Sequence, residues 1–282
     1  MSENANQSNC NHQCEGCSVE NCGGRTNPAS FRIEPNSRSS IKKIIGVVSG
    51  KGGVGKSFVT SMLAAEMQRR GNRTAVLDGD ITGPSQAVSF GIHEKALSDG
   101  EVIYPAVTPA GTQVISMNML LNEDDVPVIW RGPVVSGILK QFYQEVLWED
   151  VDYMFVDMPP GTSDVPLTMF QSIPLDGIIV VTSPQELVSM VVAKAINMAK
   201  AMNVKILGLI ENMSYVQCPC CNEKIMAFGQ SHLNETAAKY GLPVLAKLPL
   251  DPRIAEACDR GQIEDLEVEE IKPAADVLET LS

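Results

Sequence analysis

The segment from residue 50 to residue 57 combines the residue types that bind phosphate groups. Gly50, Gly55, Lys56 and Ser57 fit the pattern G-x-x-x-x-G-K-[ST] without a gap. Glycines allow backbone N–H groups to point at phosphate oxygens where a side chain would collide with them. The Lys56 ammonium can reach the β- and γ-phosphates, and the Ser57 hydroxyl can ligate Mg²⁺. The sequence therefore predicts a nucleoside triphosphate site with a magnesium ion.

The elements around this segment are those that a phosphate-binding loop requires. Ile44 to Val48 is a short apolar run that predicts a buried strand. From Phe58 to Arg70, apolar residues recur at helical spacing. Such a helix adds the positive end of its dipole at the loop. The alternative is a glycine-rich turn that binds nothing, and the agreement of motif and context disfavours it.

Acidic residues follow two further predicted strands. Residues 73–77 predict a strand that leads into Asp78 and Asp80, and residues 152–156 predict one that ends at Asp157. The carboxyl ends of parallel strands form the ligand-binding edge of an open sheet. Asp157 therefore has the position of a Walker B residue that holds Mg²⁺ through water, and Asp78 and Asp80 can act on the metal-bound or attacking water. The alternative is that Asp78 and Asp80 are a simple acidic pair at a strand-to-turn junction with no catalytic role.

Seven of the eight cysteines lie in two tight clusters, and in a cytosolic protein this favours metal binding over disulfides. The first cluster consists of Cys10, Cys14, Cys17 and Cys22. Four thiolates in so short a segment can hold an iron–sulfur cluster, which we favour, or a tetrahedral zinc ion. Free thiols in a disordered tail are the third possibility. The second cluster consists of Cys218, Cys220 and Cys221, of which Cys218 and Cys221 form a C-x-x-C pair.

Composition and charge exclude several other classes of function. The 282 residues carry a formal net charge of −12, which disfavours a broad nucleic-acid surface. No apolar run approaches the roughly 18 residues that a membrane span needs. The first residues show neither the basic nor the apolar segment of a signal peptide. We therefore expect a cytoplasmic protein that binds neither nucleic acid nor membrane.

The chain divides into a cysteine-rich segment with a linker over residues 1–40 and an ATPase domain over residues 41–282. The first part has few large apolar residues and cannot form much of a core. The second is long enough for one large α/β domain. Its further predicted strands are residues 113–117, 177–182, 205–210 and 243–248. Its further predicted helices are residues 133–148, 186–202, 230–240 and 254–260.

Lys51 assigns the phosphate loop to a narrower class of such loops, because it gives the loop the sequence Gly-Lys-Gly-Gly-Val-Gly-Lys-Ser. This resembles the deviant phosphate loop of the MinD/ParA/nitrogenase-iron-protein class. The resemblance implies an ATP-dependent dimer in which Lys51 reaches the nucleotide of the partner. Phe58 departs from the class, which usually has a second hydroxyl residue there. Its backbone N–H group is still available, so we expect at most a weakened α-phosphate contact.

The whole of residues 41–282 resembles the Mrp/NBP-type P-loop ATPases that carry iron–sulfur clusters. The matching blocks are residues 50–57, 78–81 with 83–85, 131–133, 157–164, 211–214, the pair Cys218 and Cys221, and residues 249–252. The resemblance implies a mostly parallel twisted sheet with helices on both faces. It also implies catalytic roles for Lys51, Lys56, Asp80 and Asp157. The nucleotide contacts it implies are Gly50, Lys51, Gly52, Gly53, Val54, Gly55, Lys56, Ser57, Phe58 and Asn212.

The resemblance further implies that Cys218 and Cys221 of two chains bind one [4Fe–4S] cluster, which passes to recipient apoproteins. The assembly would be a homodimer, or a heteromer with a relative. Some members carry a second cluster where Cys10, Cys14, Cys17 and Cys22 lie, although the spacing here departs from the eukaryotic version.

Three other functions fit parts of the sequence. A ParA- or MinD-like positioning switch requires a basic surface or a membrane-binding tail, whereas residues 264–282 are acidic. An electron donor like the nitrogenase iron protein has overlapping chemistry but must keep its cluster. A zinc-binding scaffold without enzymatic activity would explain the cysteines but not the phosphate loop.

Overall fold

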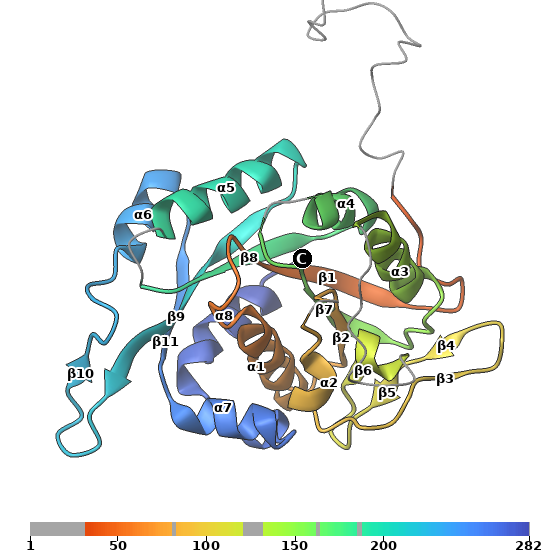
Figure 1. Ribbon diagram of the computed structural model, residues 1–282, viewed down its shortest axis with the longest axis horizontal. Helices are drawn as coiled ribbons and strands as arrows, with labels where there is room; N and C mark the ends of the chain where they lie inside the picture. Colours follow the sequence, from red (N-terminus) through yellow and green to blue (C-terminus); the bar gives the residue numbers. More distant parts are fainter. Residues whose placement is uncertain (1–31, 81–82, 121–131, 162–163, 185–187, 282) are drawn as a thin grey trace, which may run out of the picture.

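The computed structural model describes residues 32–80, 83–120, 132–161, 164–184 and 188–281 (Figure 1). The strands of its main sheet are β1 (Ile41–Ser49), β2 (Thr74–Asp78), β5 (Ala106–Val107), β6 (Gln113–Ile115), β7 (Val151–Asp157), β8 (Gly177–Thr182), β9 (Ile206–Gln217), β10 (Lys224–Ile225) and β11 (Val244–Pro249). They form one sheet in the order β10-β9-β8-β1-β7-β2-β6-β5, with β11 also paired to β9. A separate hairpin consists of β3 (Leu97–Ser98) and β4 (Ile103–Tyr104).

The sheet is parallel from β9 to β6 and antiparallel only where β10 and β5 join it. In this order β1 lies between β7 and β8, and β7 lies between β1 and β2. The register pairs Asp157 with Val47 on one side and with Asp78 on the other. The carboxyl ends of these three strands therefore lie next to one another, at the edge where open parallel sheets bind ligands.

Helices cover both faces of the sheet, which confirms the predicted fold class. The α-helices are α1 (Lys56–Arg69), α2 (Gln86–Ser89), α3 (Gly132–Gln144), α4 (Asp164–Ser172), α5 (Val188–Ala201), α6 (Leu233–Tyr240), α7 (Pro252–Asp259) and α8 (Lys272–Glu279). Short 3-10 turns are η2 (Met117–Met119), η3 (Ile263–Asp265) and η4 (Glu269–Ile271). One face packs against α3 to α6, and the other packs against α1, α7 and α8 (Figure 1).

Strand β1 shows how the sequence builds these two cores. Ile44 and Val48 belong to the core under α3 to α6, whereas Ile45 and Val47 belong to the core under α1. Successive side chains of a strand point to opposite faces, so a strand covered on both sides must be apolar throughout. The continuous apolar run before the phosphate loop therefore predicted a central strand correctly.

The predicted and observed elements differ in several places. The helix expected over residues 133–148 ends at Gln144, because Val146 forms a bridge with Ile103 and the backbone on either side bonds to that residue. The segment after Asp157 contains α4, which we did not predict. The strand expected over residues 205–210 continues to Gln217, one residue before the first cysteine of the C-x-x-C pair.

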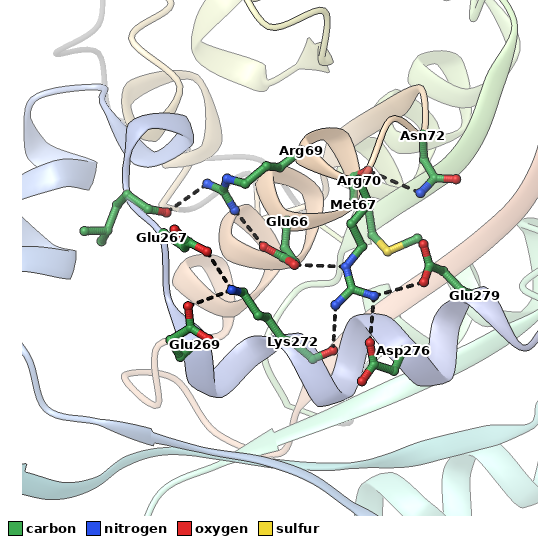
Figure 2. Close-up of polar contacts among 11 residues, drawn as sticks. Glu66, Met67, Arg69, Arg70, Asn72, Glu267, Glu269, Lys272, Asp276 and Glu279 are labelled. Atoms are coloured by element: carbon green, nitrogen blue, oxygen red, sulfur yellow. Dashed lines mark hydrogen bonds and ion pairs between the residues drawn. The ribbon is translucent and has the colours of Figure 1, made fainter.

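An ion-pair network joins the end of α1 to the C-terminal helix α8 (Figure 2). The Arg70 guanidinium donates to Glu66 at 2.9 Å, to Asp276 at 2.7 Å and to Glu279 at 2.9 Å. Arg69 donates to Glu66 as well, at 2.7 Å. Acidic residues of the C-terminal stretch thus hold the helix that begins at the phosphate loop.

The same helix α8 buries three apolar residues completely. Ala274, Ala275 and Leu278 have no exposed surface and belong to the core under α1. Among the described residues, no helix is long and apolar enough to cross a membrane.

The Arg70 network predicts a measurable difference in stability between variants at two arginines, Arg70 and Arg73. Arg70→Met leaves the buried Glu66 carboxylate with Arg69 alone, so we expect the free energy of unfolding to fall by about 2 kcal/mol. Arg73→Met removes ion pairs from a side chain that is 51% exposed, and should cost less than about 1 kcal/mol. Urea denaturation of both variants measures the difference. Equal losses would show that the α1–α8 network does not stabilise the fold.

Candidate functional site

The predicted phosphate loop connects β1 to α1 and surrounds a cavity. Gly55 precedes the first residue of α1 and has a φ of 79°, and Gly53 has a φ of 78°. Residues other than glycine rarely adopt this left-handed backbone conformation, which explains why glycine occupies both positions. The cavity has a volume of about 230 Å³ and is lined by Ser49, Gly52, Gly53, Gly55, Lys56, Ser57, Phe58, Asp80, Ser85 and Pro160.

Most of the residues predicted to contact nucleotide therefore meet at one cavity. Gly50 and Lys51 are half-buried and are not among its lining residues. Val54 is buried, 2% exposed, and belongs to the core under α1. The backbone of the loop is tied to its surroundings, since the Ser49 hydroxyl donates to the Lys51 carbonyl at 2.9 Å.

Lys56, which lines this cavity, forms a buried ion pair with Asp157. The Lys56 ammonium donates to Asp157 Oδ1 and lies 4.0 Å from Asp80 Oδ2. Asp157 has no exposed surface, and Lys56 is 5% exposed. The Thr60 hydroxyl also lies within hydrogen-bond distance of Asp157 Oδ1, at 3.3 Å. The structure thus brings together Lys56, Asp80 and Asp157, which the sequence motifs placed in three separate segments.

A second buried carboxylate, Asp78, organises the segment that follows β2. Its Oδ2 accepts the N–H groups of Ser85 at 3.0 Å and Gln86 at 3.1 Å, and the Ser116 hydroxyl at 2.8 Å. Its Oδ1 accepts the N–H group of Asp80 at 3.1 Å. Burial and the neighbouring negative charge of Asp157 raise the pKa of the Asp78 carboxyl. Asp78 therefore fixes the backbone on both sides of the loop that carries Asp80.

Gln86 is a site residue that sequence reasoning missed. Its side-chain amide N–H group donates to Asp157 Oδ2 at 2.8 Å and to the Ser57 carbonyl at 3.1 Å. Its carbonyl oxygen accepts the Ser61 hydroxyl at 2.7 Å. Gln86 has no exposed surface. A glutamine outside any recognised motif carries no local signal, and its position beside Asp157 depends on contacts between residues far apart in the chain.

Backbone hydrogen bonds hold the ends of β1, β2 and β7 at fixed distances. Gly161 N–H donates to the Ser49 carbonyl at 2.9 Å, and Gly79 N–H donates to the Asp157 carbonyl at 2.8 Å. The turn after Asp157 thus contacts the start of the phosphate loop. Such an arrangement allows events at the nucleotide to change the position of the neighbouring turn.

Asn212 lies against the phosphate loop from β9. Its side-chain amide donates to the Val54 carbonyl at 3.0 Å, and the residue is 6% exposed. A Cβ atom at Gly55 would lie 2.0 Å from Asn212 Nδ2. In this structure Asn212 therefore supports the loop, and its direct contact with nucleotide stays a prediction.

The C-x-x-C pair lies in the turn between β9 and β10. Asn222 N–H donates to the Cys218 carbonyl at 2.9 Å, and Cys218 N–H donates to the Glu223 carbonyl at 2.9 Å. Backbone N–H groups of Cys220 and Cys221 lower the pKa of the Cys218 thiol, because they stabilise the thiolate. Cys218 is half-buried, and Cys220 and Cys221 are exposed. This turn therefore presents thiols at the surface, and the role of Cys218 and Cys221 as metal ligands stays a prediction.

The other cysteines have different positions. Cys258 is buried in α7, and burial raises the pKa of its thiol to about 11, which suits a core residue. Cys10, Cys14, Cys17 and Cys22 lie outside the described residues, as does Arg131. A cavity of about 460 Å³ lies beside Cys218, and Asp251, Arg253 and Glu270 contribute to its lining.

Residues 40–281 match the model of a protein family described as ParA: NUBPL iron-transfer P-loop NTPase. The chain belongs to this family. It is similar to two proteins named iron-sulfur cluster carrier protein. That of Clostridium perfringens is 42% identical over 261 residues, which cover 90% of each chain. That of Methanocaldococcus jannaschii is 42% identical over 257 residues, which cover 89% of each chain. The resemblance inferred from the motifs is thus confirmed.

Solved structures of relatives agree with this assignment. The nucleotide-binding protein of Archaeoglobus fulgidus in complex with ADP is 36% identical, with a TM-score of 0.73. The match covers 86% of the present chain and 93% of that one. The cell division ATPase MinD of Pyrococcus furiosus matches with a TM-score of 0.62 at 21% identity, covering 85% and 99% of the two chains, and so shows a shared fold. The family is one of P-loop NTPases, as the phosphate loop predicted.

The contact between Gly55 and Asn212 predicts different outcomes for two glycines of one loop. Gly55→Ala places a methyl group on Asn212 and forces alanine into a left-handed conformation, which should cost about 2 kcal/mol or more. Gly52→Ala meets no atom within 4 Å and should change the free energy of unfolding by about 0.5 kcal/mol at most. Denaturation without nucleotide measures both.

The double variant Gly55→Ala with Asn212→Ala is the matched control. It removes the collision but not the backbone strain, so it should recover part of the loss. Equal stability of the two single variants would contradict the loop geometry described above.

Proposed function

We propose that this chain is an ATP-dependent carrier that binds an iron–sulfur cluster and transfers it to recipient apoproteins. The observation that carries the proposal is that a single strand, β9, contacts the phosphate loop through Asn212 and ends at the surface cysteine pair. The names and identities of the two curated relatives support the same function. We also expect the protein in the cytoplasm, where thiols stay reduced.

The residues at the nucleotide site fit a magnesium ion. Ser57, Asp80 and Asp157 offer a hydroxyl and two carboxylates, the hard oxygen donors that Mg²⁺ prefers. Asp78 and Asp157 place two buried carboxylates side by side, and Lys56 is the cation that the structure pairs with Asp157. When bound with ATP, magnesium neutralises charge on the phosphates. Lys56 would then contact the β- and γ-phosphates, and Asp80 would orient the attacking water.

The proposed assembly rests on the number of ligands that one chain supplies and on the resemblance to the deviant phosphate loop. Cys218 and Cys221 provide two thiolates, and a [4Fe–4S] cluster takes four. A cluster at this turn therefore requires two chains, and we propose a homodimer in which Lys51 reaches the nucleotide of the partner. A second cluster at Cys10, Cys14, Cys17 and Cys22 is also part of the proposal.

Strand β9 offers a path by which ATP can affect the cluster. Met213, next to Asn212, has a φ of 56°, which is unusual for a side-chain-bearing residue. The pairing of β9 with β11 is irregular at the same place, between Lys247 and Pro249. A change at the phosphate loop would therefore reach a distorted part of the strand that ends at Cys218. Coupling requires that ATP binds one cluster state more tightly than the other.

The nucleotide half of the proposal is tested by Asp157→Asn. The change keeps side-chain volume and removes a charge next to the triphosphate, so ATP hydrolysis should fall by about 100-fold or more. Asp152→Asn is the matched control, because Asp152 lies at the other end of β7 and pairs with Lys42. It should lose some stability and keep its hydrolysis rate. Normal hydrolysis by Asp157→Asn would refute its assignment.

The cluster half is tested by replacing Cys218 and Cys221 with alanine. We expect about one cluster per dimer to be lost and transfer to a test apoprotein to stop, because the remaining thiols cannot complete the ligand set. Cys220→Ala is the control and should keep both properties. Iron and sulfide per chain, with transfer assayed with and without ATP, are the measurements.

Two results would contradict the carrier function. If the double variant keeps its full iron content and still donates cluster, the cysteine assignment is wrong. If the wild-type protein passes electrons to an acceptor while its cluster stays bound, the protein is an electron donor.

A further inference from the structure

Gln86 makes three side-chain hydrogen bonds that connect separate parts of the nucleotide site. They join the Walker B carboxylate of Asp157, the Ser57 carbonyl in the first turn of α1, and the Ser61 hydroxyl one turn further along α1. We propose that Gln86 is a positioning residue. Its amide holds one oxygen of Asp157, so that the other oxygen faces Lys56 and would be available to hydrated magnesium once Lys56 contacts the phosphates. The inference rests on the proposed function, which assigns Asp157 to magnesium.

The orientation of the Gln86 amide follows from its partners. The Ser57 carbonyl can only accept a hydrogen bond, so the nitrogen of the amide must face it. The same nitrogen then donates its second hydrogen to Asp157 Oδ2. The amide oxygen is left to accept from Ser61, whose hydroxyl can donate.

The two oxygens of Asp157 therefore have separate partners. Oδ2 accepts from Gln86, whereas Oδ1 accepts from Lys56 and lies near the Thr60 hydroxyl. Lys56 is the group that phosphate-loop proteins direct to phosphates, so its departure would leave Oδ1 available. Gln86 would still hold Oδ2 and prevent the carboxylate from rotating away.

A neutral amide suits this role better than a charged group. A lysine or arginine at this position would cancel the charge of Asp157 and compete with a divalent cation. An apolar side chain would leave Oδ2 buried without this donor, which is costly in a site closed to water. Gln86 itself is fixed from its backbone, because its N–H group donates to Asp78 Oδ2.

The experiment measures how strongly Mg²⁺ increases the affinity for a non-hydrolysable ATP analogue, by equilibrium binding with Mg²⁺ and with EDTA. Gln86→Met keeps a similar volume and removes all three side-chain hydrogen bonds. We expect the increase caused by Mg²⁺ to fall by about 10-fold, with affinity in EDTA changed by less than about 2-fold. The rise in melting temperature caused by magnesium and the analogue should shrink in parallel.

Gln68→Met is the matched control. Gln68 also makes three side-chain hydrogen bonds, to the Ala110 carbonyl and to the N–H and hydroxyl of Thr74, but lies at the far end of α1. This variant should lose stability and keep the full effect of Mg²⁺. Ser61→Ala is a milder second variant that removes the hydroxyl within hydrogen-bond distance of the Gln86 carbonyl oxygen, at 2.7 Å, and of the Ser57 carbonyl, at 2.9 Å. It should reduce the effect of Mg²⁺ by about 3-fold alone, and add nothing in the Gln86→Met background.

The outcomes separate this inference from the proposed function. If Mg²⁺ enhances binding to wild type and equally to Gln86→Met, the positioning role is wrong and the nucleotide site stands. An equal reduction of the Mg²⁺ effect in Gln86→Met and Gln68→Met also overturns the positioning role, because it shows a general loss of stability. If Gln86→Met does not fold, an unchanged effect of Mg²⁺ in Ser61→Ala overturns it. A wild-type protein that binds no nucleotide would instead refute the proposed function.

Discussion

The burial of two carboxylates beside each other is the constraint on which the nucleotide site depends. Asp78 and Asp157 pair in register at the ends of β2 and β7, and neither has any exposed surface. Such charges are costly to bury unless donors and cations surround them. Lys56, Gln86, Ser116 and three backbone N–H groups meet that need in this structure. Because these donors come from four different segments, satisfying the carboxylates also fixes the relative positions of the loops.

Helix α1 serves this site and the hydrophobic core at once. Its inner surface carries polar residues toward the site, including Lys56, Thr60 and Ser61, together with the apolar residues that pack on the sheet. A helix of this kind cannot be held by one apolar stripe alone. The ion pairs of Arg70 with Asp276 and Glu279 of α8 supply a second attachment at its far end. These two residues of the acidic C-terminal stretch thus have a structural role.

Strand β9 connects the phosphate loop with the turn that carries Cys218 and Cys221. Its buried part contacts the phosphate loop, and its last residues pair with β10 in a hairpin whose turn carries the cysteines. The cysteines are therefore at the surface, where a second chain or a recipient can approach, whereas Lys56, Asp78 and Asp157 are buried. The separation suits a carrier, whose cargo must be able to leave.

The sequence alone determined the features whose signals are local. The phosphate loop, the position of Asp157 after an apolar strand, the C-x-x-C pair and the alternation of helices and strands are contiguous patterns, so they predicted the fold class and much of the nucleotide cavity. The tertiary structure alone decided which distant polar residues meet. Gln86 lies 71 residues from Asp157 in the chain, and Asn212 lies 158 residues from Val54. The burial of Asp78 and the attachment of α8 to Arg70 are of the same kind. No periodicity marks such residues, because a buried hydrogen bond depends on which strands are neighbours in the sheet, and that order is set by packing of the whole domain.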